Sequence, residues 1–119
     1  MSKRDDKVYL RHILDSSAKI EAYLQGVNEE KFSRNTLIQD GLIRQLEIIG
    51  EAVKRVSSGL RDQYAHIPWK DIAGMRDKLI HDYFGIDLEA VWMTSINDVP
   101  RLSEQIRHIL QDLESNRNQ

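Results

Sequence analysis

The sequence predicts an all-α fold, an antiparallel bundle of four to five helices. Apolar residues recur at steps of three and four along most of the 119 residues, and no alternating apolar run bounded by turn signals indicates a sheet. With 40% hydrophobic and 30% charged residues, the chain has enough apolar material for one core. We therefore expect a single domain over residues 1–119, with a polar tail at 115–119 that frays.

The first half of the chain predicts a helical hairpin. A helix is expected over residues 5–24, and Gly26 ends it. Its apolar stripe consists of Leu10, Ile13, Ser17, Ile20 and Leu24. Asn35 or Thr36 can cap a second helix that stops near residues 57–59. The second stripe consists of Ile38, Leu42, Ile49, Val53 and Val56. The two helices are expected to pack side by side.

A third helix is expected to begin at residues 67–69, because proline is tolerated in a first helical turn. Gly85 is expected to end this helix, which therefore spans residues 67–85. Trp69 opens it as a packing anchor, and Trp92 falls on the apolar face of the next helix. Both indoles are expected in the core or in an interface.

Asp87 caps a fourth helix with a mostly apolar seven-residue repeat. The repeat consists of Leu88, Trp92, Ser95, Val99, Leu102, Ile106, Ile109 and Leu113. Pro100 is expected to kink this helix, because proline lacks the amide proton and clashes with the carbonyl of Ile96. The repeat can close the core of one chain or supply the seam of a homodimer, and the two alternatives are compatible.

Composition narrows the classes of function. The chain has no cysteine, which fits a reducing cytoplasm, and no apolar run suited to a signal peptide or a membrane span. Its net charge is −2, so any contact with nucleic acid must come from a local basic patch. The candidate phosphate-binding cations are Lys54, Arg55, Arg61, Lys70 and Lys78. Solvated helix faces are the ordinary alternative.

The strongest chemical signal comes from Arg76, Asp77, His81 and Tyr83. Arg76 offers a permanently charged fork for phosphate oxygens, and His81 can accept or donate a proton near neutral pH. Asp77 lies one helical turn from His81 and could orient its imidazole. On a straight helix Arg76 and His81 diverge by roughly 140°, so two copies facing each other across a dimer would aim both groups more easily than one chain. Spacing alone favours ordinary surface and packing roles.

A second set of polar residues could support this segment. Arg44, Glu47 and Glu51 stand at helical spacing, so they could line the same cleft, support Arg76 through a salt bridge, or form an exposed stripe. We name Arg44 and Glu51, with Asp77, as supporting residues. No metal is expected, because no histidine stands at compatible spacing and nearby cations repel one. The remaining histidines, His12, His66 and His108, are expected to have ordinary structural roles.

The hallmark of the HEPN superfamily is a motif of arginine, any four residues, histidine, any one residue and tyrosine. Residues 76–83 of this chain match that motif and read RDKLIHDY. Two longer segments extend the likeness: RQLEIIGEAVKRVS at 44–57 and IPWKDIAGMRDKLIHDYFGID at 67–87. Over about residues 10–113, the chain resembles the HepT-like branch of this superfamily. Members of that branch are the toxin halves of modules whose antitoxin is a minimal nucleotidyltransferase.

The resemblance implies a metal-independent endoribonuclease that needs no cofactor and acts as a homodimer. Arg76 and His81 would be catalytic, with the two copies of the motif lining one cleft and RNA as the substrate. The cognate minimal nucleotidyltransferase would silence the toxin by attaching AMP to Tyr83. The alternative is a non-catalytic module that binds a nucleotide or docks the nucleotidyltransferase, and a purely structural helical dimer is a third possibility.

Overall fold

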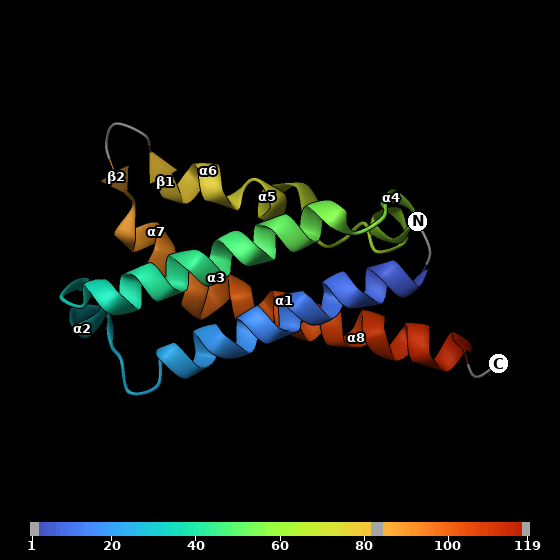
Figure 1. Cartoon of the computed structure of the whole chain (residues 1–119), viewed down its shortest axis with the longest axis horizontal. Helices are drawn as coiled ribbons and strands as arrows, with labels where there is room; N and C mark the ends of the chain where they lie inside the picture. The colour runs from blue at the N-terminus through green and yellow to red at the C-terminus, as the bar shows by residue number, and fades with distance from the viewer. Residues whose placement is uncertain (1–2, 82–84, 118–119) are drawn as a thin grey trace.

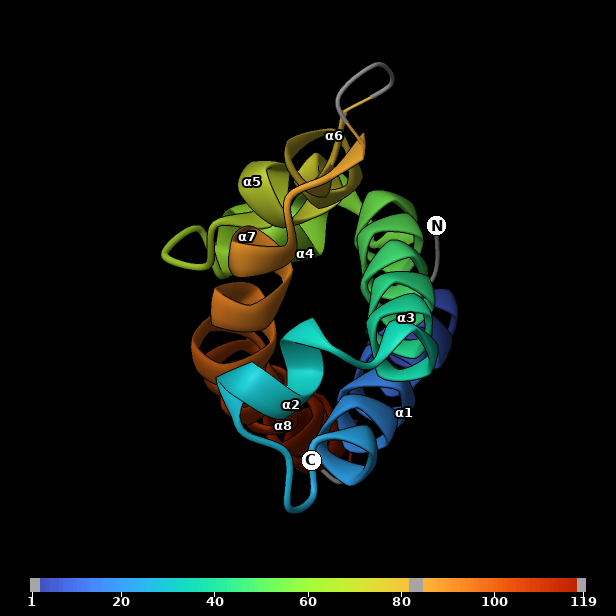
Figure 2. The same ribbon diagram turned by 90° about the vertical axis from the view of Figure 1, so that its left-hand side faces the viewer.

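The computed structural model describes residues 3–81 and 85–117, which form a helical bundle, so the predicted all-α class is confirmed. Helix α3 (Thr36–Arg55) runs through the middle, with α1 (Lys3–Tyr23) antiparallel beside it and α8 (Val99–Arg117) packed against α1. Figure 2 shows the same helices nearly end-on, arranged around the core. None of the described helices is long and apolar enough to cross a membrane.

The helical hairpin of α1 and α3 is where the sequence predicts it. Asn35 caps α3, because its side-chain oxygen accepts a hydrogen bond from the amide of Ile38 at 3.0 Å. The polar connection before it is partly helical, since α2 (Glu29–Ser33) occupies it and buries Phe32. The centroid of the Phe32 ring lies 5.3 Å from that of Trp92, which gives this short helix an apolar contact with the last third of the chain.

The prediction of a single helix over residues 67–85 is wrong. After α4 (Ser58–Gln63), the chain forms two short helices, α5 (Trp69–Ala73) and α6 (Met75–Leu79), with Gly74 between them. Strand β1 (Ile80–His81) then pairs antiparallel with β2 (Gly85–Ile86). His81 therefore has strand backbone and does not share a helix with Arg76.

Backbone hydrogen bonds from the returning chain explain why α6 stops at Leu79. The amide of Asp87 donates to the carbonyl of Leu79 at 2.9 Å, and Ile80 is extended with φ −117° and ψ 115°. A β-branched residue such as Ile80 fits this extended backbone well. Gly85 has a φ of 80°, a conformation that glycine adopts without steric cost. The ladder thus replaces the last helical turns that periodicity alone predicted.

The last third of the chain is one continuous helical run. Asp87 caps α7 (Leu88–Met93) as predicted, because its side-chain oxygen accepts from the amide of Ala90 at 3.0 Å. A π-helical segment, η1 (Thr94–Asp98), joins α7 to α8 immediately before Pro100. A π-turn is one way to accommodate a lost helical hydrogen bond, and proline causes such a loss. The kink at Pro100 and the fraying of 115–119 stay predictions.

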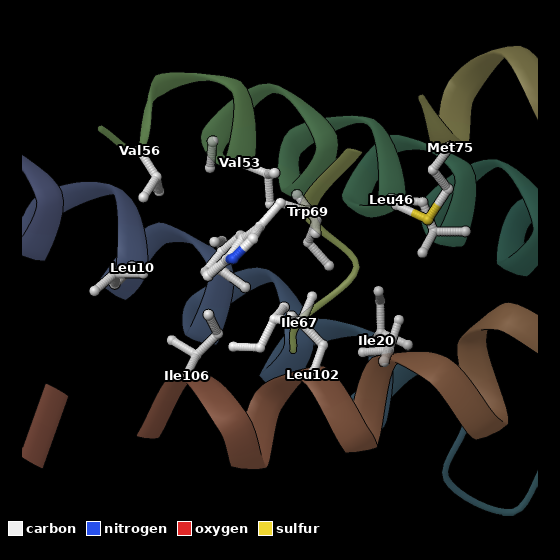
Figure 3. Packing of buried hydrophobic residues seen from close by; sticks show 14 of the residues in the cluster. Leu10, Ile20, Leu46, Val53, Val56, Ile67, Trp69, Met75, Leu102 and Ile106 are labelled. Carbon is white, nitrogen blue, oxygen red and sulfur yellow. The ribbon is translucent and has the colours of Figure 1, made fainter. Parts of the chain in front are cut away.

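The apolar stripes predicted for the three long helical segments meet in one core (Figure 3). In α8 the buried positions are Val99, Leu102, Ile106, Ile109 and Leu113. The seven-residue repeat therefore faces the chain's own core, and it does not offer a free seam for a dimer. Trp69 is only 6% exposed and lies between α3 and α8 in Figure 3. Its indole N–H donates a hydrogen bond to the carbonyl oxygen of Tyr64 at 3.0 Å. The core positions predicted for Trp69 and Trp92 are confirmed.

Gly50 lets the chain after α4 lie close against α3. A Cβ atom at this buried position would meet the carbonyl oxygen of Ile72 at 3.4 Å and that of Ala73 at 3.6 Å. Contacts of this length are ordinary for one methyl group but leave no room for a larger side chain. The C-terminal end of α5 is therefore held next to the C-terminal half of α3, and α6 starts from there.

A buried carboxylate ties the start of α1 to the corner between α3 and α4. Asp6 is 2% exposed, and its two side-chain oxygens accept from the amide of Ser57 at 2.7 Å and from its hydroxyl at 2.6 Å. The same hydroxyl caps α4 by accepting from the amide of Leu60. Asp6 therefore fixes how the antiparallel pair of α1 and α3 is aligned.

We expect Asp6→Ala to lower the free energy of unfolding by about 2 kcal/mol, because hydrogen bonds to charged groups contribute about 1.5–3 kcal/mol and Ser57 loses both acceptors. The measurement is the urea midpoint at constant m value. Asp15→Ala, at an exposed position on the same helix, is the control and should unfold like the wild type. Equal midpoints for the two variants would contradict the stabilising role of Asp6.

A second prediction concerns the link between Tyr64 and α8. Partial burial, a hydrogen bond of 2.8 Å to Asp112 and the negative charge of that carboxylate raise the pKa of Tyr64 from 10.0 to about 12. The folded state thus favours the protonated phenol. Its contribution to stability is complete below pH 10 and is lost as the pH rises toward 12.

Wild type should therefore lose stability relative to Tyr64→Phe between pH 10 and pH 12, and the difference should be constant below pH 10. Urea midpoints of both proteins across this range provide the measurement. Comparison with the variant removes the effect of the other tyrosines. A difference that does not change between pH 10 and pH 12 would show that Tyr64 titrates normally.

Candidate functional site

A groove of about 430 Å³ runs along the side of α3, between α1 and the α5–α6 segment. Helix α3 contributes the polar residues Arg44, Glu47, Glu51, Lys54 and Arg55. Tyr9 and His12 of α1 line one wall, and Arg76 of α6 lines the other. A larger and more apolar groove of about 550 Å³ lies between α5–α6 and the last helical run, but none of these residues lines it. We refer to the first as the α3 groove.

Arg76 is held in the α3 groove by an ion pair. Its Nε lies 3.3 Å from a carboxylate oxygen of Glu47, and the side chain of Arg76 remains 56% exposed. A guanidinium has five N–H donors, so a contact through Nε leaves the terminal nitrogens for another anion. Glu47 therefore restricts the orientation of Arg76 without consuming its capacity to bind phosphate.

The α3 groove is more basic than the chain as a whole. It contains the cations Arg44, Lys54, Arg55 and Arg76 and only two carboxylates, while the whole chain carries a net charge of −2. Glu47 pairs with Arg76, and Glu51 pairs with Lys54 at 3.2 Å. Among the described side chains, no carboxylate lies within ion-pair distance of Arg44 or Arg55. This is a local patch of the kind that polyanion binding requires.

The structure brings together only part of the predicted site. Arg44, Glu51 and Arg76 line the α3 groove, whereas Asp77 is exposed on α6 and does not line it. The backbone of His81 lies in β1, and Tyr83 falls outside the described residues.

The divergence of roughly 140° predicted between Arg76 and His81 assumed one straight helix. It does not describe the structure, because α6 ends at Leu79, between the two residues. The prediction that Asp77 lies one helical turn from His81 is wrong for the same reason. Of the predicted cations, Lys54 and Arg55 lie in the α3 groove. The others lie in different depressions.

Tyr9 and His12 are the aromatic lining residues that sequence reasoning missed. His12 is exposed, Tyr9 is half-buried, and their ring centroids lie 6.1 Å apart with the planes at 81°. The sequence did place both residues at the edge of the buried face of α1, since each immediately precedes a position of its apolar stripe, Leu10 or Ile13. The apolar pattern does not indicate which edge of that buried face lies beside α3.

Within residues whose placement the structure describes, no three side chains of histidine, aspartate or glutamate gather as they would around a metal ion. The side chain of His81 is not among those residues. The expectation of metal-independent chemistry therefore stays a prediction.

Known proteins resemble this chain closely. The family model described as ribonuclease HepT-like matches residues 13–109. A provisionally named RNase of Methanocaldococcus jannaschii is 44% identical over 96% of this chain and 98% of its own length. A probable ribonuclease HepT of Thermococcus cleftensis is 41% identical over 84% of this chain and 91% of its own length.

A longer protein of Methanocaldococcus jannaschii is named both gamma-glutamylcyclotransferase and, provisionally, RNase. It is 45% identical over 98% of this chain, but the chain spans only 52% of that protein. No solved structure shows significant similarity. The match of the family model over most of the helical bundle, together with these identities, shows that the chain belongs to the HepT-like ribonuclease family of the HEPN superfamily.

Proposed function

We propose that the protein is a metal-independent endoribonuclease, the toxin of a toxin–antitoxin module, and that it cleaves RNA as a homodimer. The observation that carries this proposal is Arg76, which Glu47 holds at Nε in a groove where cations outnumber carboxylates. Such a groove suits a phosphodiester backbone, because neutralised phosphates dominate the affinity for nucleic acids. The names of the relatives, which include RNase and ribonuclease HepT, support RNA as the substrate.

The cleavage follows from the chemistry of two side chains. His81 removes the proton of the ribose 2′-hydroxyl, or protonates the leaving 5′-oxygen, while the 2′-oxygen attacks phosphorus. Arg76 stabilises the negative charge that builds up on the phosphorane oxygens. The bond from phosphorus to the 5′-oxygen breaks, and a 2′,3′-cyclic phosphate remains. The 2′-hydroxyl is an internal nucleophile, so no metal-bound water is required.

A composite site in a homodimer deepens this proposal. The seven-residue repeat of the last helical run is buried within one chain, so dimerisation must use another surface. The edge next to the motif is a good candidate, because Ile86 pairs with Ile80 beside His81 and is 43% exposed. Burial of such a side chain against a second copy is favourable. The partner's copy of the motif would then line the same cleft as Arg76.

Regulation at Tyr83 completes the proposal. A cognate minimal nucleotidyltransferase would transfer AMP from ATP to the phenolic oxygen of Tyr83, with release of pyrophosphate. The added phosphate is anionic, so it would compete with RNA for the guanidinium of Arg76. Arg44 would add to the same attraction, since it lines the groove without a carboxylate partner among the described residues. Modification and substrate would thus exclude one another.

We expect wild type to cut single-stranded RNA in the presence of a metal chelator, and His81→Ala to cut at least about 100-fold more slowly, because general acid–base catalysis contributes about 10²–10⁴-fold. The measurement is the rate of cleavage on denaturing gels, with the 2′,3′-cyclic ends identified by mass spectrometry. His108→Ala is the matched control, since His108 is exposed on α8 away from the α3 groove.

Equal rates for wild type and His81→Ala would remove His81 from the mechanism. RNA that is bound but never cut by wild type would favour the alternative, a non-catalytic binding module. The cations of the α3 groove support binding on their own, so both outcomes must be measured on the same samples.

Coexpression with the nucleotidyltransferase should add the mass of one or more adenylyl groups to wild type and none to Tyr83→Phe. Intact-mass spectrometry measures this directly. Tyr64→Phe is the matched control, because Tyr64 is bonded to Asp112 and should leave the modification unchanged. Full modification of Tyr83→Phe would place the acceptor elsewhere.

A further inference from the structure

The aromatic pair in the α3 groove has no task in the cleavage chemistry. Tyr9 and His12 stand three residues apart on α1, so they project from the same face of that helix. Their rings meet edge to face, with centroids 6.1 Å apart and planes at 81°. In such a pair each ring keeps at least one face that its neighbour does not cover.

The alignment of α1 and α3 places this pair across the α3 groove from Arg76. Asp6 of α1 is hydrogen-bonded to Ser57, just after the end of α3, and the two helices run antiparallel. Tyr9 and His12 therefore lie beside the part of α3 that precedes Ser57 by one to two turns. Glu51 lies in that part of α3. Glu47, which holds Arg76, lies one helical turn farther, about 6 Å along the axis.

Charge at this end of the groove suits a nucleotide. Lys54 and Arg55 line it together with the aromatic pair, and Lys54 is partly neutralised by Glu51 at 3.2 Å. Arg55 has no such partner among the described side chains. Accessible aromatic rings beside cations are the arrangement that proteins use to stack bases and bind the adjoining phosphates. In this pair His12 is exposed, whereas Tyr9 is half-buried and packs in part against the core.

We propose that Tyr9 and His12 form a subsite that stacks an unpaired nucleobase on the wall of the α3 groove opposite Arg76, which binds a phosphate of the same strand, so that the groove selects single-stranded RNA over duplex. This inference rests on the proposed function, because it names the class of RNA for the same groove. In a duplex the faces of the bases are already stacked on one another and cannot reach the two rings. A single strand can turn one base out of its stack.

The test uses a fluorescent single-stranded RNA oligonucleotide with 2′-O-methyl sugars, which lacks the hydroxyl needed for cleavage, and the duplex that it forms with its complement. Anisotropy titrations should show tighter binding of the single strand by wild type. Tyr9→Ala and His12→Ala should each weaken that binding about tenfold, since stacking on an aromatic side chain contributes about this factor. Both variants should bind the duplex as wild type does.

Two further variants separate stacking from other effects. Tyr9→Phe keeps the ring and should retain the binding of the single strand. His108→Ala is the control for His12→Ala, because both positions are exposed but only His12 lines the groove. His12→Ala removes an exposed side chain, so it keeps the test decisive if Tyr9→Ala proves less stable.

Unchanged binding of the single strand by both alanine variants would overturn the subsite. An equal loss for single strand and duplex would overturn it too, because it would indicate a phosphate contact. Failure of the proposed function has a different signature, since wild type would then leave ordinary RNA uncut or unbound. Wild type that cleaves RNA, alongside alanine variants that bind normally, would remove the stacking subsite and leave the nuclease proposal intact.

Discussion

Burial of one face of α3 is the constraint on which the rest of this structure depends. Leu42, Leu46, Ile49 and Val53 are almost completely buried, and they fix the rotation of the helix about its own axis. The remaining face must then present its charged residues beside α1 and α6. Because helical side chains repeat every 3.6 residues, the core also decides which cations line the groove. A change in the core packing of α3 would therefore alter the site without touching any residue in it.

Close backbone approach is the second part of this constraint. Gly50 allows the carbonyl oxygens of Ile72 and Ala73 to lie against α3, and α6 starts a few residues later. Glu47, one turn before Gly50, then meets Arg76 at 3.3 Å. The position of the arginine therefore follows from a missing side chain as much as from its own contacts. A larger residue at position 50 would push the α5–α6 segment outward and separate the pair.

Local patterns predicted the long helices well and the region around the motif poorly. Periodicity and caps are properties of neighbouring residues, so α1, α3, the cap at Asp87 and the buried indoles could be predicted. The end of α6 depends on a hydrogen bond from Asp87, which comes from a chain segment that returns to Leu79, and no helical pattern contains that information. The place of His12 likewise depends on which flank of α1 faces α3. In the predicted site, Glu47 was one of several partners for Arg76, and only the packing of two elements distinguishes it.

The positions of the two tryptophans have a practical consequence for optical experiments. Trp69 and Trp92 are buried in the core, and neither lines the α3 groove. Indole emission should therefore follow the integrity of the packed interior and respond little when an anion occupies the opposite face of the central helix. Intrinsic fluorescence can thus serve as a folding reporter for every variant, while occupancy of the groove is read from a label on the nucleic acid.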